Sequence, residues 1–472
     1  MAAVTRRLWA AWRHVAAPAI TGAVLALPLL GTPAPGRAQE QIEQQEPTPS
    51  AVEQVATPIE RAFVPAPAPQ PFVLLPELRE RLKDAPAFFR DMKLDVNLRT
   101  YYFNREKYDD THLEALATGG ALSFQSGWLL DTLSVSAVLY TSQPLHAPDA
   151  RDGTALLETG QKGYTVLGQL YARLKFLDRN FVNLYRYAYD TPYLNRDDSR
   201  MSPKTFEGYT LQGSVGGQDG APAFRYGAGY ITKIKDRNDD DFIWMSRQAG
   251  AAVDRGVAML GALFSSGGLS VGGIDYYCAD VINIGYGEGK YLVPGPAGAG
   301  VLVSAQYVDQ RSVGGNFMTG VAFDTELFAV KAEASYGNAV VSLAWSRTAH
   351  GADLQNPWSG NPGYSGAMIQ KFNRAGEQAL LARLSYDFRR LGVEGLTAYA
   401  LFVHGASRVA PTTRSAVPNE NEVDLDVQWR PAWKGLTGLW LRARYGHVEQ
   451  YQGPKNAMTE YRLVVSYDFS VL

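Results

Sequence analysis

Near its carboxyl end the chain reads Thr437-Gly-Leu-Trp-Leu-Arg-Ala-Arg-Tyr-Gly-His447. The odd positions from Leu439 to Tyr445 are apolar, whereas the even positions include Arg442 and Arg444. Successive side chains of a β-strand point to opposite faces, so this segment predicts a strand with one apolar and one basic face. A soluble sandwich would turn the polar face to bulk water. A membrane barrel would turn the apolar face to lipid and line a channel with the polar one.

The composition excludes several classes of protein. The chain has 472 residues, 46% hydrophobic and 19% charged, enough for one large domain or about three average ones. No run of about 18 apolar residues follows the N-terminal region, so helical membrane spans are not predicted. The formal net charge of -2 gives no footprint for nucleic acid. The single cysteine, Cys278, rules out an intrachain disulfide and a thiolate metal cage, and no cofactor or metal motif is present.

The N-terminus has the pattern of a secretory signal peptide. Arg6, Arg7 and Arg13 form a basic start, and an apolar run interrupted by proline follows at residues 16–30. Small residues precede a cleavage site that we place after Ala38, so residues 1–38 are predicted to be removed. A membrane anchor is the alternative, which the short core and its prolines disfavour.

Residues 39–87 are predicted to form a periplasmic spacer. Up to residue 76 the segment is rich in Pro, Ala, Gln and Glu, and its prolines prevent sustained helix and central strand alike. We interpret it as disordered, and binding of a partner is the alternative to a plain tether. Residues 76–84 have a brief helical pattern, which we expect to cap the periplasmic mouth of a barrel.

From residue 88 to residue 472 the chain alternates apolar and polar side chains in short runs. The predicted strands are 93–103, 115–125, 131–141, 163–176, 180–189, 205–213, 223–232, 256–265, 269–277, 280–290, 300–308, 326–336, 339–347, 377–388, 396–404, 421–430, 438–447 and 459–469. They number about eighteen, an even number, as in single-chain bacterial outer-membrane barrels. We therefore predict an all-β fold, a transmembrane antiparallel up-and-down β-barrel.

The connections between these strands alternate in length. Some are tight, such as Gly267-Gly268 and Gly337-Asn338, and others are long, such as 142–162, 190–204, 233–255, 348–376 and 405–420. An up-and-down barrel with short periplasmic turns and long outside loops gives this rhythm. Aromatic residues at strand ends fit the girdles found at the two membrane interfaces.

Several segments resemble the OprD-type porin family of Gram-negative outer membranes. The fairly specific one is Leu94-Asp-Val-Asn-Leu-Arg-Thr-Tyr-Tyr-Phe-Asn-Arg105, which resembles the opening strand of the family. Supporting segments are Thr205-Phe-Glu-Gly-Tyr-Thr-Leu-Gln212, Gly395-Leu-Thr397, the strand at 439–444 and Glu460-Tyr-Arg-Leu-Val-Val-Ser-Tyr467. The resemblance covers residues 88–472.

The resemblance implies an eighteen-stranded, often trimeric barrel that passes small water-soluble nutrients, typically carboxylates. It also implies a loop that narrows the pore and an inward row of Arg and Lys. Arg442 and Arg444 fall where the family has two of these inward arginines. The chain departs from the family at residues 399–403, where another basic position is apolar, and in its proline-rich spacer.

The alternation also assigns basic residues to the lumen, because Arg or Lys facing lipid at mid-bilayer costs about 2–4 kcal/mol. The candidates for guiding a solute are Arg442, Arg444, Arg383, Arg462, Arg173, Lys175 and Arg186, the last on a strand that alternates poorly. Planar guanidinium forks suit carboxylate oxygens. The alternative is that these cations pair with lumen carboxylates such as Asp424, Asp426 and Glu333 and only stiffen the wall.

The candidate constriction is the loop that contains Asp190, Tyr193, Asp197 and Asp198. Opposed to a basic wall, its acids would create a field across the narrow part of the pore. An ordinary solvated loop is the alternative, and the loop at 348–376 is a second candidate for the constriction.

These patterns predict a channel in the Gram-negative outer membrane for passive, substrate-selective diffusion of small nutrients bearing a carboxylate, such as organic acids or amino acids. The expected partners are these solutes, outer-membrane lipid and lipopolysaccharide, the barrel assembly machinery and, as an alternative to a monomer, two further copies in a homotrimer. The competing functions are a general or sugar porin and a barrel enzyme such as a lipase. An enzyme would need neighbouring Ser and His residues, and no such pair is evident.

Overall fold

The computed structural model describes residues 72–472, apart from 219–220, 297–298, 359, 434 and 452–456. The predicted signal peptide and the part of the predicted spacer up to residue 71 lie outside the described residues. The segment expected to be helical contains α3 (Pro76–Arg81), and α4 (Ala87–Arg90) follows it. No helix in the described part of the chain is long and apolar enough to cross a membrane.

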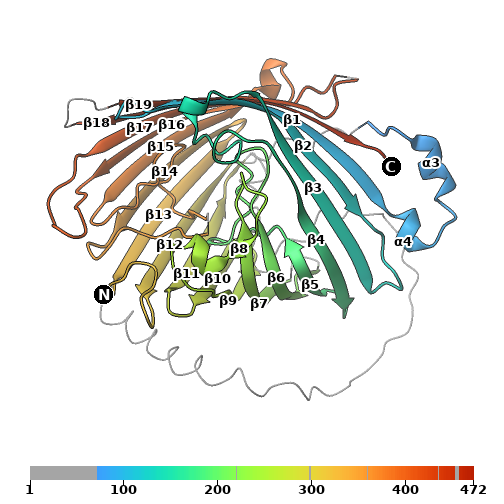
Figure 1. Ribbon diagram of the computed structural model, residues 1–472, viewed down its shortest axis with the longest axis horizontal. Coiled ribbons are helices and arrows are strands. Elements are labelled where there is room, and N and C mark those ends of the chain that lie inside the picture. The colour runs from blue at the N-terminus through green and yellow to red at the C-terminus, as the bar shows by residue number, and fades with distance from the viewer. Residues whose placement is uncertain (1–71, 219–220, 297–298, 359, 434, 452–456) are drawn as a thin grey trace, which may run out of the picture. The chain divides into compact units, whose positions relative to one another are not determined.

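The described chain forms one antiparallel sheet that closes into a barrel (Figure 1). Its wall strands are β1 (Lys93–Glu106), β2 (His112–Gln125), β3 (Leu133–His146), β4 (Tyr164–Phe176), β5 (Asn180–Tyr187), β6 (Thr205–Gly216), β7 (Ala223–Lys235), β9 (Val257–Ser266), β10 (Leu269–Cys278), β11 (Ile282–Pro294), β12 (Gly300–Ser312), β13 (Asp324–Tyr336), β14 (Ala339–Thr348), β15 (Gln378–Asp387), β16 (Leu396–Ala406), β17 (Glu420–Trp429), β18 (Leu439–Gln450) and β19 (Ala457–Ser470). The two-residue β8 (Ile243–Trp244) pairs with β7 alone, and β7 also pairs directly with β9. Eighteen strands therefore form the wall, and each corresponds to a predicted strand.

The first and last strands close the sheet. β1 pairs with β2 on one side and with β19 on the other, from Asp95 opposite Ser470 to Glu106 opposite Thr459. Closure removes the row of unpaired backbone groups that an edge strand would present, which hydrocarbon does not tolerate. The up-and-down topology predicted from the lengths of the connections is confirmed.

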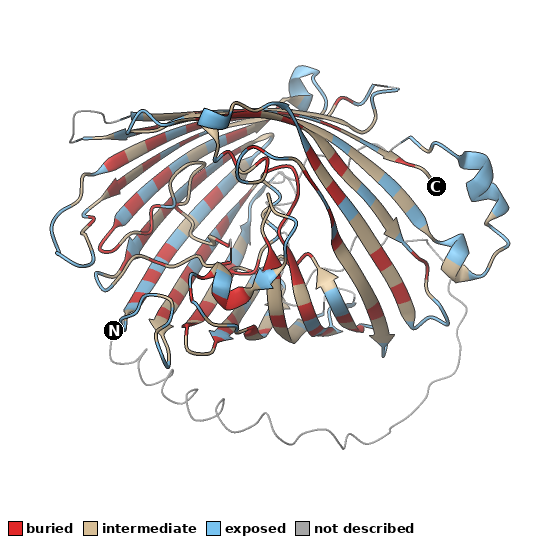
Figure 2. Ribbon diagram, in the orientation of Figure 1, coloured by how far each residue is buried: buried red, intermediate tan, exposed pale blue. Residues whose placement is uncertain are grey.

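The burial of alternate side chains distinguishes a membrane barrel from a soluble sandwich. Buried and exposed residues alternate along the strands of the wall (Figure 2). On β17, Val423 and Leu425 are 40% and 46% exposed, whereas Glu422 and Asp424 are at most 1% exposed. A water-soluble protein buries its apolar residues and exposes its charged ones. The reverse order on this strand is expected when the outer face meets lipid and the inner face lines a polar lumen.

Long loops enter the lumen and build an apolar core inside the barrel. We name two of them the β5–β6 loop (residues 188–204) and the β14–β15 loop (residues 349–377). Tyr193 from the first and Trp358 from the second belong to one buried cluster with inward residues of the wall, such as Tyr276 on β10 and Val308 on β12. Because this cluster draws its wall residues from β6 to β13, it occupies that side of the lumen.

A short η1 helix (Asp149–Arg151), the α5 turn (Met245–Gln248) and η4 (Phe388–Leu391) complete the regular elements. At the end of the barrel where β19 stops, Val73 bridges to Ser470, and the backbone N–H of Leu74 donates to the Ser470 carbonyl at 2.8 Å. The Gly127 N–H likewise donates to the Phe88 carbonyl at 2.9 Å. The segment that carries α3 and α4 is therefore attached to the barrel by backbone hydrogen bonds.

Candidate functional site

The side of the lumen formed by β17, β18, β19 and β1 lies outside the cluster of Tyr193 and Trp358, and it carries an arginine cluster beside a second, smaller group of buried apolar residues that includes Phe103. Arg442 and Arg444 lie two residues apart on β18, and both contact Asp426 on β17, at 2.7 Å and 2.6 Å. The register places Arg444 directly opposite Asp426. Arg444 also donates to the Tyr399 hydroxyl at 3.1 Å. The Asp426 carboxylate is buried, so the ion pairs supply the hydrogen bonds it needs.

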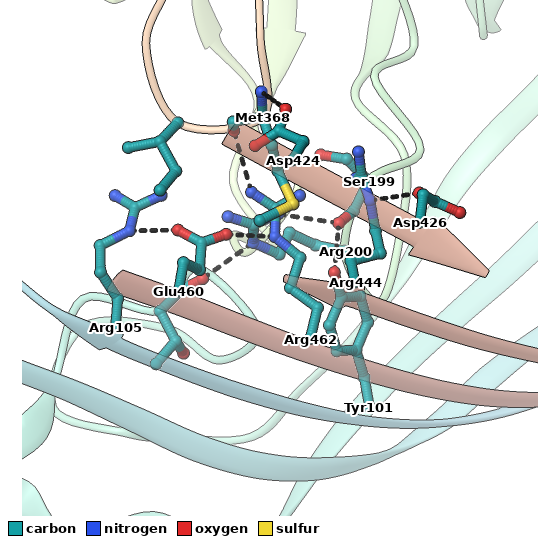
Figure 3. Close-up of polar contacts among 12 residues, drawn as sticks. Tyr101, Arg105, Ser199, Arg200, Met368, Asp424, Asp426, Arg444, Glu460 and Arg462 are labelled. Carbon is teal, nitrogen blue, oxygen red and sulfur yellow. Dashed lines mark hydrogen bonds and ion pairs between the residues drawn. The ribbon is translucent and has the colours of Figure 1, made fainter. Parts of the chain in front are cut away.

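The cluster continues on β19 and β1. Arg462 on β19 lies opposite Arg444 in the register, and it forms an ion pair with Glu460. Arg105 on β1 reaches the same Glu460 carboxylate (Figure 3). Glu460 on β19 therefore pairs with two arginines, just as Asp426 on β17 pairs with Arg442 and Arg444.

The β5–β6 loop adds Arg200, which was not among the predicted residues. Its Nε donates to the Thr154 carbonyl at 2.9 Å, and its guanidinium lies 4.7 Å from the centre of the Phe103 ring. Arg105 and Arg462 approach the same ring at 5.4 Å and 5.7 Å. Three guanidinium groups therefore surround one aromatic ring, an arrangement that cation–π attraction stabilises.

Arg200 differs from the four wall arginines of this cluster because no carboxylate pairs with it among the described residues. Its side chain is 5% exposed, and its other hydrogen bond goes to the Ser199 carbonyl. Burial lowers the pKa of Arg200, and the positive charge of Arg462 acts in the same direction. A buried cation beside another cation would be stabilised by an anion from the pore. Residue 200 was part of the predicted constriction loop, but no sequence pattern shows where a loop turns inward.

The other predicted lumen residues lie away from this cluster. Arg383 on β15 pairs with Glu333 at 3.3 Å, and Lys331 shares that carboxylate at 2.8 Å. Arg173 on β4 is buried, donates to Asn183 at 2.8 Å and to the Tyr187 hydroxyl at 3.2 Å, and has no carboxylate partner in the described part of the chain.

Lys175 and Arg186 pair with residues outside the arginine cluster. Lys175 pairs at 3.1 Å with Asp131, whose side chain is 78% exposed at the β2–β3 turn. Arg186 follows Tyr185, whose positive φ of 86° interrupts the regular strand. Its Nε lies 3.4 Å from Glu207, and its guanidinium lies 3.9 Å from the ring of Phe242.

The β5–β6 loop reaches the wall through Asp198, which pairs with Arg99 on β1 at 2.6 Å. Asp197 pairs at 2.9 Å with Arg237 of the β7–β9 connection. Asp190 instead forms an ion pair inside the loop, with Arg196. Tyr193 is fully buried and packs against Tyr276, with ring centres 5.9 Å apart. Tyr193 thus anchors the loop.

The β14–β15 loop also crosses the lumen. On one side the Tyr364 hydroxyl donates to Glu288 on β11 at 2.6 Å. On the other side the Met368 N–H donates to Asp424 on β17 at 2.8 Å, and Arg462 donates to the Met368 carbonyl at 3.2 Å. Both loops that the sequence offered as candidates for the constriction therefore lie inside the barrel.

The only group of acids in the described residues with the spacing of metal ligands is Glu158, Asp239 and Asp240, whose carboxylate oxygens lie within 4.8 Å of one another. Asp239 and Asp240 belong to the β7–β9 connection. Exposed acidic groups of this kind are ordinary at a protein surface.

The chain matches the family model described as outer membrane porin, OprD family, over residues 86–471. Among solved structures it is similar to Pseudomonas aeruginosa OpdK with vanillate, with a TM-score of 0.70, 22% sequence identity and coverage of 81% of this chain and 100% of that chain. It is also similar to Pseudomonas aeruginosa OccK9 (OpdG), with a TM-score of 0.72, 24% identity and coverage of 82% and 100%. A BenF-like porin from Pseudomonas fluorescens gives a TM-score of 0.71, 19% identity and coverage of 81% and 100%. No curated protein matches the chain in sequence.

Proposed function

Because the chain belongs to the OprD family of outer membrane porins, we propose that its channel favours small solutes that bear a carboxylate, such as organic acids and amino acids. Porins of this family are outer-membrane channels for small solutes, and the chain is a protein of the Gram-negative outer membrane. Family and fold point to passive diffusion and not to an enzyme. The preference for carboxylates is the step beyond family membership.

The observation that carries this proposal is the position of Arg200. The wall arginines 442, 444 and 462 each have a carboxylate partner, and this agrees with the alternative in which they stiffen the wall. Arg200 adds a positive charge with no such partner in the described chain, in contact with the Phe103 ring that Arg462 also approaches. The cluster is therefore electropositive where the loop meets the wall, which favours an anionic solute.

The wall arginines act together with Arg200. Arg442 and Arg444 keep 26% and 15% of their side chains exposed while they bind Asp426, so part of each guanidinium faces the lumen. Guanidinium forks bind carboxylates in two-pronged geometry, and rings of charge select ions in channels. Because Asp426 and Glu460 compete for the same forks, each contact with a solute is weak, and the solute is released to the next one. The OpdK structure contains vanillate, which is a carboxylate of the proposed class.

The proposal extends to the surroundings of the barrel. The apolar outer face would contact outer-membrane lipid and lipopolysaccharide, and the barrel assembly machinery would insert the chain as a monomer or as part of a homotrimer. The signal peptide at residues 1–38 and the spacer at residues 39–87 remain predictions within the same scheme. A general or sugar porin is the competing function, which the extensive pairing of the wall arginines supports.

The test is planar-bilayer recording of Arg442→Glu with Arg444→Glu. Carboxylate flux should fall about tenfold, equivalent to about 1.4 kcal/mol of barrier, and the reversal potential should shift toward cation selectivity. The charge-retaining pair Arg442→Lys with Arg444→Lys is the matched control and should keep most of the selectivity. Arg200→Gln tests the loop cation without placing new acids beside Asp426. Equal selectivity of all variants and the parent, or equal fluxes of sugars and acids, would favour the general porin.

A further inference from the structure

The tip of the β14–β15 loop is bound by two acids of the wall. Glu422 and Asp424 lie two residues apart on the inner face of β17, and both are at most 1% exposed. The N–H groups of Ile369 and Gln370 donate to the two oxygens of Glu422, at 2.6 Å and 2.8 Å. The Met368 N–H donates to Asp424 at 2.8 Å (Figure 3). Three consecutive backbone amides thus bind two neighbouring carboxylates.

The residues directly opposite Glu422 and Asp424 on the two neighbouring strands offer these acids no side-chain donor. The loop is therefore their main hydrogen-bond donor. Glu422 lies between Val403 on β16 and Val448 on β18 in the register, and Asp424 lies between Leu401 and Gly446. None of these four flanking residues carries a polar side chain. A buried carboxylate without donors is strongly destabilising, so the amides of the loop tip satisfy groups that the wall alone leaves unpaired. Residues 401 and 403 lie in the segment where the sequence lacks the basic residue expected from the family.

The tip and the wall also fit closely at Gly446. A Cβ atom at this position would lie 2.5 Å from the terminal methyl of Met368 and 3.0 Å from a carboxylate oxygen of Asp424. A side chain at this position would displace the flexible end of Met368 and crowd the Asp424 carboxylate. The base of the loop is held differently, because Phe372 packs against Leu381, Leu401 and Val403 of the inner wall. The base therefore depends on apolar contact and the tip on the two carboxylates.

We propose that Glu422 and Asp424 are positioning residues of the constriction, which hold the tip of the β14–β15 loop across the lumen while they are ionised and release it when they are protonated. Both oxygens of Glu422 accept a hydrogen bond, which a protonated carboxyl cannot do equally well because one of its oxygens becomes a donor. Acid therefore weakens the attachment of the tip and widens the pore. This inference rests on the chain being a channel and does not require a preference for carboxylates.

The other charged or titratable groups around the pair belong to several elements. They are Asp426 and Glu420 on β17, Arg444 on β18, Arg462 and Glu460 on β19, Tyr399 on β16, Tyr108 of the β1–β2 connection, and Lys371 and Arg374 of the loop itself. Arg444 and Arg462 favour the ionised form of Asp424, whereas burial and the neighbouring carboxylate favour protonation of the pair, so the release is expected to begin near neutral pH and to continue as the pH falls.

The first experiment compares single-channel conductance from about pH 9 down to about pH 4, because burial beside a second carboxylate extends the titration of an acid above its usual range. The parent channel should show an acid-induced rise in conductance. Glu422→Gln with Asp424→Asn should show the wide state already at neutral pH and lose the acid-induced step. Glu333→Gln is the matched control, because it removes one lumen carboxylate that binds Lys331, Arg383 and Ser342 and no loop amide. A parent without an acid step, or a double variant that keeps it, would overturn the proposal.

A crosslink gives a second test that does not depend on removing the acids. Met368→Cys with Gly446→Cys puts one thiol on the tip and one on the wall, at the two positions that the Met368 side chain now bridges. Once the two thiols are joined by a short disulfide-containing linker, this variant should stay in the narrow state at acidic pH, and a reductant should restore the acid-induced rise. An acid response that persists with the crosslink formed would show that the tip does not gate the pore. Anion selectivity, read from the reversal potential, is a separate measurement, so failure of this inference leaves the proposed function testable.

Discussion

The two loops that cross the lumen are attached to the wall with opposite polarity. The β5–β6 loop presents a carboxylate, Asp198, to Arg99 of the wall, and its backbone carbonyls at residues 199 and 200 accept from Tyr101 and Arg99. The β14–β15 loop presents backbone N–H groups to Glu422 and Asp424. The first loop is held mainly through acceptors that it brings to the wall, and the second through donors.

This difference has a consequence for how each loop responds to its surroundings. The β5–β6 loop is also held by apolar burial of Tyr193 and by several wall donors, so no single protonation releases it. The tip of the β14–β15 loop depends mainly on two neighbouring acids, beside one hydrogen bond from Arg462 to the Met368 carbonyl, and protonation acts on both acids. The lumen therefore contains one firmly held loop and one whose tip is sensitive to pH.

The largest expected effect comes from removing the core that the two loops share. Trp358 is fully buried, and its Nε1 donates to the Met245 carbonyl at 2.9 Å. Trp358→Ala should lower the free energy of unfolding by about 3–5 kcal/mol, measured by denaturant titration of the folded barrel in detergent. Trp433→Ala, at a position 60% exposed, is the control and should change stability far less. Similar losses for the two variants would show that the loops do not share a core.

A smaller effect is expected from breaking the attachment of the β5–β6 loop alone. Arg99→Gln removes the ion pair with Asp198 and a 2.6 Å hydrogen bond to the Arg200 carbonyl. Hydrogen bonds that involve a charged group contribute about 1.5–3 kcal/mol, so stability should fall by this order and current noise should rise without a change in the acid response. Arg247→Gln breaks an exposed pair with Asp254 and is the matched control, worth less than about 1 kcal/mol. Loss of the acid response in the Arg99 variant would mean that the two loops are not attached independently.

A pH-dependent effect sharpens the comparison at the end of the β14–β15 loop. Glu377 accepts from the Arg374 N–H at 2.9 Å, and burial raises its pKa from 4.5 to about 7. A raised pKa means that the folded state binds the proton more tightly than the unfolded state does. The contribution of Glu377 to the free energy of unfolding is therefore fully present below about pH 4.5. It declines by about 1 kcal/mol per pH unit as the pH rises to about 7.

Glu377→Gln should abolish that decline. The measurement is the unfolding free energy of parent and variant between about pH 5 and about pH 8, where the curves should diverge as the pH rises. Glu394→Gln, outside this loop and its contacts, should leave the slope of the parent unchanged. A parent whose stability rises through this range would contradict the assignment to Glu377.

Much of the barrel was predictable from the order of side chains. Each of the eighteen predicted strands has a counterpart, because alternation of period two is a local property and lipid leaves only apolar side chains on the outer face. Strand ends were off by a few residues: β3 runs to His146 and β18 to Gln450, beyond the predicted ends at 141 and 447. Ladder hydrogen bonds extend a strand past its last alternating residue when its neighbours are long.

The site was predictable only in part. The inward phase of Arg442, Arg444 and Arg462 follows from their strands, but their partners do not, because which residues face one another depends on the register between strands. Arg186 does not follow the regular alternation of its strand because the preceding residue, Tyr185, adopts a positive φ. The alternation of side chains in the sequence does not predict such a backbone angle. Arg200 and the acids Glu422 and Asp424 gained their roles from loops that return from sequence separations of about 50 residues or more.

The order of amino acids alone determined the closed barrel, the side of each strand that faces lipid and the presence of inward arginines, because each of these depends on neighbours in the chain and on the hydrophobic solvent around it. Tertiary structure decided the rest. It determined which arginines are neutralised, which loops fill the lumen and which acids hold the loop tip, because these depend on contacts between segments whose separation in sequence carries no record of their distance in space.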